Sequence, residues 1–96
     1  MPLTDAQRRH LRALAHPLKP VVLVGDRGIT DALLRELDLS LAHHELLKVR
    51  VKAADRDERD ALVARLCEAT GAELVQRIGH VAVLYRRAEK PRIALP

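Results

Sequence analysis

A run of four aliphatic residues, Val21 to Val24, ends abruptly at the sequence Gly25-Asp26-Arg27-Gly28. A short continuous run that is rich in β-branched residues and closed by glycine is typical of a strand buried on both faces. We therefore expect a central strand at this position. Thr30 then provides an N-cap for a predicted helix from Asp31 to about His43. A strand, a glycine-framed loop and a helix in succession restrict the chain to folds in which a sheet and helices share a core.

Two further helices are predicted, from Thr4 to Ala15 and from about Arg56 to Thr70. Each begins with a capping-box pattern, in which an N-cap side chain precedes a Glu or Gln by three residues. The two pairs are Thr4 with Gln7 and Asp55 with Glu58. Pro17 breaks the earlier helix because proline cannot continue it, and Gly71 ends the later one with a residue that tolerates a left-handed backbone.

Alternating residues predict another strand, from Leu47 to Lys52. The apolar positions are Leu47, Val49 and Val51, and the basic positions are Lys48, Arg50 and Lys52. Successive side chains of a strand point to opposite faces of the sheet. One face of this strand should therefore be buried, while the other carries a row of cations.

The last two strands are predicted to form a hairpin, with Ala72 to Ile78 and Val81 to Arg86 on either side of Gly79-His80. Glycine at the first of two loop positions is typical of a type II′ turn. This turn would place Glu73 opposite Arg86 as a favourable cross-strand pair. Residues 87–96 follow as a basic tail bounded by prolines.

The resulting order α-β-α-β-α-β-β predicts an α/β fold, of the two-layer α+β kind, with one mixed four-stranded sheet. The chain has 96 residues, and we expect a single domain over residues 1–96. One cysteine, Cys67, allows no intramolecular disulfide, which fits a reducing compartment. No apolar run approaches the roughly 20 residues that span a bilayer, and no signal peptide is recognisable. We therefore expect a cytoplasmic monomer without a membrane segment.

The net charge of +4 is unevenly distributed. Residues 1–28 carry five Arg or Lys against two Asp, and residues 71–96 carry five basic against two acidic side chains. The middle of the chain has a slight acidic excess. If the two ends lie together, they form a positive patch that attracts phosphates. On charge alone, an ordinary basic surface is an equally good interpretation.

The sequence Gly25-Asp26-Arg27-Gly28 is the feature that most suggests a binding site. Glycines allow a ligand to come close to the main chain, and the following helix start offers unpaired N–H groups to an anion. A GxxG loop clamps a nucleic-acid backbone in KH domains. Taken alone, however, a plain tight turn is the commoner explanation, and Asp26 adds a negative charge. The candidate RNA contacts are Gly25, Asp26, Arg27, Gly28, Lys19, Arg8, Arg12, Lys48, Arg50 and Lys52.

Other polar residues have simpler explanations than chemistry. His43-His44-Glu45 is the densest group of possible metal ligands, but neighbours on a helix do not face one another, and helix-end residues are the better interpretation. Cys67 lies on the predicted apolar face of its helix and should be a structural thiol. We expect no catalytic residues, no metal and no cofactor. Tyr85 is the only aromatic residue, so the chain cannot build a platform on which bases stack.

Several segments together resemble the CRM-domain family (chloroplast RNA splicing and ribosome maturation), in particular its bacterial single-domain, YhbY-like branch. The matching segments are Leu14-Ala15-His16-Pro17-Leu18-Lys19-Pro20, Val21-Val22-Leu23-Val24-Gly25, Gly28-Ile29-Thr30, His43-His44-Glu45-Leu46, Thr70-Gly71-Ala72 and Leu84-Tyr85-Arg86. They cover essentially the whole chain with their spacing intact. This is far more specific than a GxxG loop alone.

The resemblance implies a fold similar to the C-terminal domain of bacterial translation initiation factor three. It also implies that the loop framed by Gly25 and Gly28 contacts RNA, and that the protein associates with precursors of the large ribosomal subunit. Our leading hypothesis is an RNA-binding assembly factor for that subunit, which contacts ribosomal RNA. The alternative is an adaptor that binds proteins on ribosomal particles without touching RNA. The basic charge favours the first, and nothing in the sequence supports an enzyme.

Overall fold

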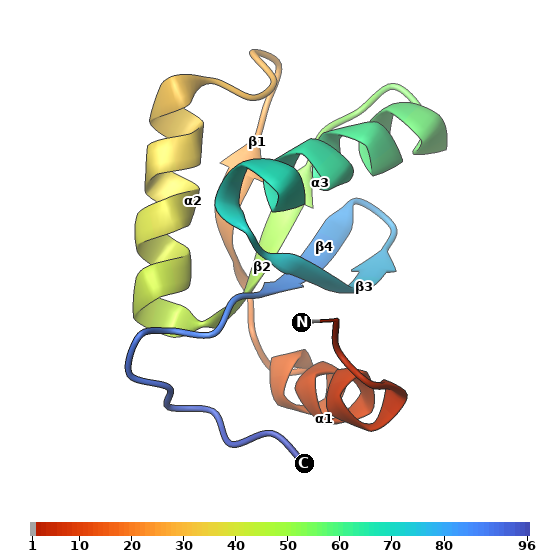
Figure 1. The fold of residues 1–96 in the computed structure, drawn as a ribbon. Helices are drawn as coiled ribbons and strands as arrows, with labels where there is room; N and C mark the ends of the chain where they lie inside the picture. Colours follow the sequence, from red (N-terminus) through yellow and green to blue (C-terminus); the bar gives the residue numbers. More distant parts are fainter. Residues whose placement is uncertain (1) are drawn as a thin grey trace.

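Helices and strands follow one another in the predicted order in the computed structural model, which describes residues 2–96 (Figure 1). This confirms the predicted α/β fold and its sequence of elements, although helices pack on both faces of the sheet, which makes three layers instead of the predicted two. The elements are α1 (Asp5–Ala15), β1 (Pro20–Val24), α2 (Asp31–His44), β2 (Leu46–Val51), α3 (Arg56–Thr70), β3 (Glu73–Ile78) and β4 (Val81–Tyr85).

The helix starts follow the capping patterns closely. Thr4 Oγ1 accepts a hydrogen bond from the N–H of Gln7 at 3.1 Å, and the Gln7 side chain accepts one from the N–H of Thr4 at 3.0 Å. This confirms the first capping box. At α3, Asp55 accepts from the N–H of Glu58 at 2.8 Å, but the Glu58 carboxylate accepts from Ala54 instead of Asp55. The second box is therefore displaced by one residue, because the chain before α3 presents the Ala54 N–H to that carboxylate.

The four strands form one mixed sheet, as predicted, and their order in the sheet is β1-β2-β4-β3. The β1–β2 pair is parallel and the other two pairs are antiparallel. The prediction that Val21 to Val24 form a central strand is wrong, since β1 lies at the edge of the sheet. Val22 and Val24 are buried, whereas Val21 and Leu23 are 49% and 58% exposed. A run of aliphatic residues does not show whether a helix will cover its second face, and here none does.

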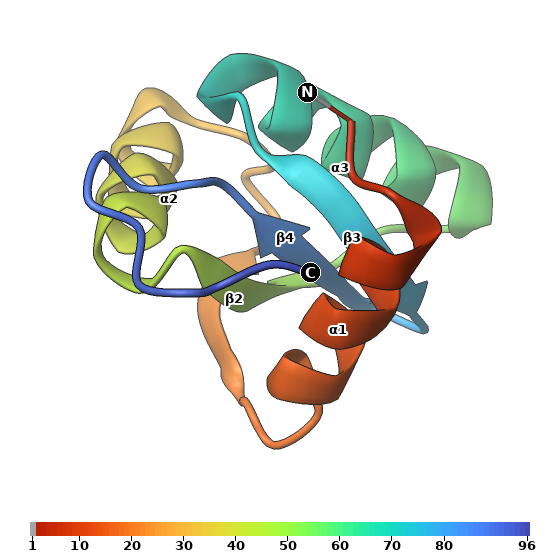
Figure 2. The same cartoon turned by 60° about the horizontal axis from the view of Figure 1, so that its bottom comes forward.

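The core lies in two layers, one on each face of the sheet (Figures 1 and 2). The larger layer is formed between the sheet and the helices α2 and α3, and it includes Val49, Leu37 and Leu66. The smaller layer lies between the sheet and α1, which contacts β2 and β3. Leu11 and Ala15 of α1 are buried there against Val83 and Tyr85.

The hairpin turn has the predicted length, but the register of its strands differs from the prediction. Gly79 has φ +56°, His80 has no positive φ, and Ile78 pairs with Val81, as in a type II′ turn. A bulge between Leu74 and Gln76 then shifts β3 by one residue. Glu73 consequently faces Tyr85, and the predicted pair with Arg86 is wrong.

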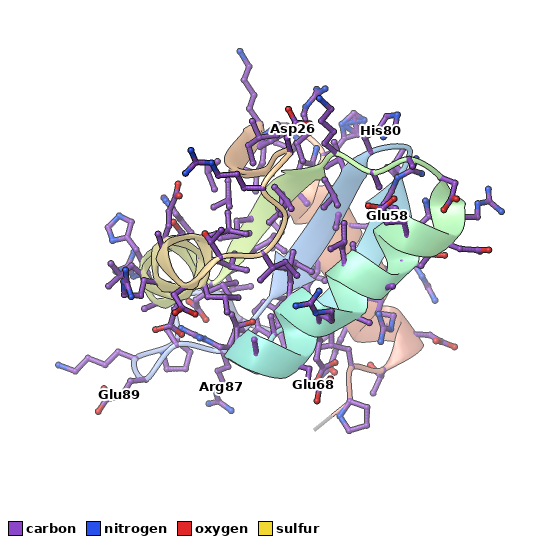
Figure 3. All side chains as sticks on the ribbon, turned by 90° about the horizontal axis from the view of Figure 1, so that it is seen from above. Asp26, Glu58, Glu68, His80, Arg87 and Glu89 are labelled. Atoms are coloured by element: carbon purple, nitrogen blue, oxygen red, sulfur yellow. The ribbon has the colours of Figure 1, made fainter. Side chains whose placement is uncertain are left out.

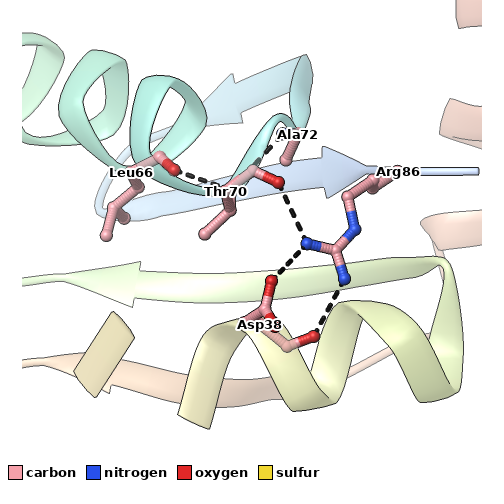
Figure 4. Close-up of polar contacts among 5 residues, drawn as sticks. All are labelled: Asp38, Leu66, Thr70, Ala72 and Arg86. Carbon is pink, nitrogen blue, oxygen red and sulfur yellow. Dashed lines mark hydrogen bonds and ion pairs between the residues drawn. The ribbon is translucent and has the colours of Figure 1, made fainter. Parts of the chain in front are cut away.

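Arg86 instead connects the two helices of the larger layer. Its Nη1 donates to Asp38 Oδ1 at 2.5 Å and to the Thr70 carbonyl at 2.9 Å, and its Nη2 donates to the Asp38 carbonyl at 3.0 Å (Figure 4). Arg86 therefore joins the middle of α2 to the last residue of α3.

The basic tail, residues 87–96, is held against the domain by Glu45. The Glu45 side chain is fully buried, and its backbone has φ +64°, unusual for a non-glycine residue. Its carboxylate accepts hydrogen bonds from the N–H groups of Arg92 at 2.5 Å, Ile93 at 3.2 Å and Ala88 at 3.3 Å. Ile93 and Leu95 then pack on the smaller core layer, and the chain ends near α1 (Figure 2).

Candidate functional site

The loop between β1 and α2 is a tight turn with an open side. The N–H of Gly28 donates to the Gly25 carbonyl at 3.0 Å, with Asp26 and Arg27 exposed at the corners. Gly28 has φ +68°, a conformation that favours glycine. Gly25 has no positive φ, and a Cβ built on it would meet no atom within 4 Å apart from its chain neighbours. The fold therefore requires glycine at Gly28 but not at Gly25, where the main chain is open to approach.

The negative charge in the loop is countered by a lysine from the neighbouring strand. The Nζ of Lys52 lies 2.7 Å from Asp26 Oδ1, and both side chains are mostly exposed. The pairing follows from the strand register, because the N–H of Lys52 donates to the Val24 carbonyl just before the loop. The hairpin turn lies at the same end of the sheet, since the His80 carbonyl accepts from Val51 at 2.6 Å (Figure 3).

Lys48, Arg50 and Lys52 form a basic row along β2 and its continuation. Their spacing of two residues places them on one face of the strand, about 6.6 Å apart. This is the face that carries α1, since Lys48 Nζ donates to the His16 carbonyl at 3.3 Å at the end of that helix. The alternating sequence predicted the basic row, and the structure shows that it runs from the end of α1 to the Gly25–Gly28 loop.

A shallow hollow lies at the α1 end of the basic row. Its volume is about 420 Å³, and its lining residues are Arg12, Ala13, Ala15, His16, Lys48, Gln76 and Ile78. Two of the predicted contact residues, Arg12 and Lys48, thus meet across it. The participation of His16 and Gln76 was not predicted, because nothing local in the sequence shows that the end of α1 lies over β3.

Arg8 and Lys19 are placed differently from the other candidate cations. The Arg8 guanidinium donates to the Leu74 carbonyl and is half-buried against β3, so it ties α1 to the sheet. Lys19 is exposed, one residue before Pro20, which is the β1 partner of Lys48. The structure thus brings Arg12 and the basic row to one side of the sheet, leaves Lys19 exposed just before β1, and turns Arg8 toward a structural contact.

The cations of the C-terminal tail do not join this surface. Arg87 lies at the end of the molecule opposite Asp26 (Figure 3). Arg92 Nη1 donates to the His43 carbonyl at 2.9 Å, at the end of α2. The tail ends beside α1, where Gln7 donates to the Pro96 carbonyl, but its cations lie away from the Gly25–Gly28 loop.

The remaining reactive groups have structural surroundings. Burial, together with the nearby Glu73, raises the pKa of the Cys67 thiol, which disfavours the reactive thiolate. Cys67 packs against the larger core layer, in line with its predicted structural role. Burial also raises the pKa of Tyr85, whose ring lies inside the smaller core layer. Within residues 2–96 no cluster of three or more His, Cys, Asp or Glu side chains is arranged to hold a metal ion.

No helix in the described part of the chain is both long and apolar enough to cross a membrane.

The fold and the glycine-framed loop define a small α/β domain in which a basic strand face leads to the start of a helix. The chain belongs to the CRS1/YhbY (CRM) domain family, which its sequence matches over residues 3–86. This confirms the resemblance seen in the sequence.

Relatives of known name or structure cover almost the whole chain. An RNA-binding protein of Haemophilus influenzae is 44% identical over 98% of this chain and 95% of its own length. A probable RNA-binding protein of Pseudomonas aeruginosa is 43% identical over 95% of this chain and 88% of its own. The solution structure of a hypothetical protein from Staphylococcus aureus, proposed to bind RNA, superposes with a TM-score of 0.86 at 40% identity, covering 99% and 100% of the two chains. These relatives carry RNA-binding names and no enzymatic ones.

Proposed function

We propose that this protein binds RNA through the sugar-phosphate backbone, using the Gly25–Gly28 loop and the basic row as one continuous contact surface. The observation that carries the proposal is the path of Lys48, Arg50 and Lys52 from the end of α1 to the open main chain at Gly25. Phosphates repeat along a nucleic acid, and a row of cations on one strand face matches such a repeated charge. The RNA-binding names of the relatives support the same class of ligand.

The loop adds main-chain contacts to this electrostatic surface. It leads directly into α2, whose N-terminus carries a partial positive charge. Asp26 would repel a phosphate, but Lys52 offsets that charge at 2.7 Å. Arg27 is exposed and forms no ion pair among residues 2–96, so it is free to meet a phosphate. Because the ring of Tyr85 is buried, RNA bases cannot stack on it. The protein would therefore contact the RNA backbone and recognise its shape.

Membership of the family suggests which RNA is bound. We propose that the protein acts on precursors of the large ribosomal subunit in the cytoplasm, as a monomeric single domain that contacts ribosomal RNA. The alternative remains an adaptor that binds a protein on the same particles. A purified protein that retains nucleic acid, with a raised ratio of absorbance at 260 and 280 nm, supports RNA contact over the adaptor.

The direct test replaces Arg27 by Ala and measures affinity for a ribosomal RNA fragment and melting temperature side by side. We expect a loss of roughly 1 kcal/mol in binding, the scale of a charge-assisted contact, at an unchanged melting temperature. The matched control is Arg65→Ala, which removes the same charge from an exposed position on α3. Equal affinity for both variants would contradict a loop-centred interface.

A further inference from the structure

Exposed aliphatic side chains gather at the free edge of the sheet. Leu18, Val21 and Leu23 are 39%, 49% and 58% exposed, in and just before β1. Val22 and Val24 point to the larger core layer, so Leu23 between them faces the side of the sheet that carries α1. Val21 lies at an irregularity in the β1–β2 register, between Pro20 and Val22, and its side chain is half exposed. However, α1 lies against β2 and β3 and leaves this face of β1 open (Figure 2). We call Leu18, Val21 and Leu23 the edge patch.

The main chain of β1 also has N–H and C=O groups on the side that faces away from β2. Among the described strands β1 pairs with β2 alone, and the Val24 carbonyl accepts from the Lys52 N–H on that side. Main-chain groups alternate in direction along a strand, so the N–H and C=O of Leu23 point away from β2, off the edge of the sheet. An open edge of this kind is a template for a further strand.

We propose that the edge patch receives a strand from a partner protein, with aliphatic side chains beside Val21 and Leu23 and acidic side chains at the ends of the strand. A peptide offers N–H donors and C=O acceptors at the spacing of the edge. An RNA backbone offers mainly acceptors, and aliphatic side chains give bases no aromatic surface on which to stack. The edge is therefore suited to a protein, although the basic row lies on the next strand.

Charge specifies the chemistry of the partner and argues against a second copy of this chain. Lys19 precedes β1 and Arg27 follows it, and neither forms an ion pair within residues 2–96. Acidic residues at both ends of an incoming strand would meet these two cations. Antiparallel pairing of β1 with its own copy would instead place Lys19 of one molecule near Arg27 of the other, which is repulsive.

The experiment titrates isotope-labelled protein with a blocked synthetic peptide, Glu-Glu-Val-Ile-Val-Ile-Glu-Glu, and follows backbone amide resonances. We expect saturable shifts centred on Val21 to Val24. Leu23→Glu should weaken binding at least tenfold, because it removes an aliphatic contact and repels the acidic probe. Leu39→Glu is the matched control, since Leu39 is 71% exposed on α2. This variant should bind the peptide as tightly as the parent protein does.

A second probe separates strand addition from simple apolar contact. The same peptide with alternate nitrogens methylated cannot donate along one edge and should lose binding, which keeps the test decisive even if Leu23→Glu unfolds. The absence of β1 shifts at millimolar peptide, or equal binding of the methylated peptide, would overturn the proposal. So would a uridine oligonucleotide that shifts Val21 and Leu23 and displaces the peptide, since the edge would then be a nucleic-acid surface.

Discussion

The ammonium group of Lys52 lies 2.7 Å from the carboxylate of Asp26, so the one acidic residue of the glycine loop is paired with the last cation of the basic row. The two residues meet because β1 and β2 are parallel, so that the carboxyl ends of both strands lie at the same end of the sheet. The contact joins the loop to the basic row, but it also occupies a cation that RNA would otherwise use.

Asp26→Asn should therefore strengthen RNA binding several-fold, because it removes a repulsive charge and releases Lys52 for a phosphate. Stability should change by no more than about 1 kcal/mol, since exposed ion pairs contribute little. Titration of a labelled RNA into both proteins measures the effect. Glu68→Gln is the control, because Glu68 lies at the opposite end of the molecule from Asp26 (Figure 3). A weaker-binding Asp26→Asn protein would mean that the Asp26–Lys52 pair shapes the loop for RNA.

Gly25→Val should reduce RNA affinity without loss of stability. A side chain fits there without a clash and needs no positive φ, and replacing glycine at such a position commonly adds about 0.4–1 kcal/mol. Gly28→Ala should instead lower stability by about 1–3 kcal/mol, because its φ of +68° is strained for any other residue. Thermal melts and RNA affinities for the two variants distinguish these effects. Full RNA affinity in Gly25→Val would show that RNA does not approach the main chain at this residue.

Arg50→Ala should make RNA binding less dependent on salt. Each neutralised phosphate contributes about −0.9 to the slope of log affinity against log salt on a duplex and about −0.7 on a single strand. Loss of one contact should flatten the slope by about that amount, whereas Arg65→Ala should leave the slope unchanged. Affinities measured at several salt concentrations decide this, and a parent protein with a flat salt response would rule out backbone contact altogether.

Glu45→Gln should release the C-terminal tail. The carboxylate accepts three main-chain hydrogen bonds, and an amide would turn a donor toward one of them, at a cost of about 1–3 kcal/mol. Amide exchange at Arg92 and Ile93 should accelerate, and trypsin should cut after Arg92 sooner than in the parent. Glu36→Gln, on an exposed part of α2, is the control. RNA affinity should stay within twofold, because Arg87 at the start of the tail lies far from the loop.

Cys67→Ala should cost roughly 1 kcal/mol of stability and leave RNA affinity unchanged. The raised pKa of the thiol further predicts slow alkylation by iodoacetamide at pH 8, because little thiolate is present. The rate should approach that of a free thiol when denaturant unfolds the chain. Rapid alkylation of the folded protein, or loss of RNA binding in a folded Cys67→Ala variant, would show that the thiol has another role.

Local sequence was sufficient wherever a structure depends on neighbours in the chain. The N-caps at Thr4, Thr30 and Asp55 satisfy N–H groups within the next turn, so each helix start could be predicted within a residue. Alternation from Leu47 to Lys52 placed the basic row on one face because strand geometry fixes that face. Matching segments along the whole chain then indicated the family, which residues 3–86 confirm.

Tertiary packing decided the features that involve residues far apart in the sequence, namely the strand order, the register of β3 and the long-range polar contacts. The edge position of β1 follows from its pairing with β2 alone, and its second face stays exposed because α1 docks on β2 and β3. Four consecutive aliphatic residues carry no information about either. The bulge after Leu74 moves Glu73 opposite Tyr85, and Arg86 then finds Asp38, 48 residues away. Likewise, the pairing of Lys52 with Asp26 and the hold of Glu45 on the tail arise only when distant segments meet. A hydrogen bond or an ion pair selects its partner by distance in space, which the order of residues does not determine.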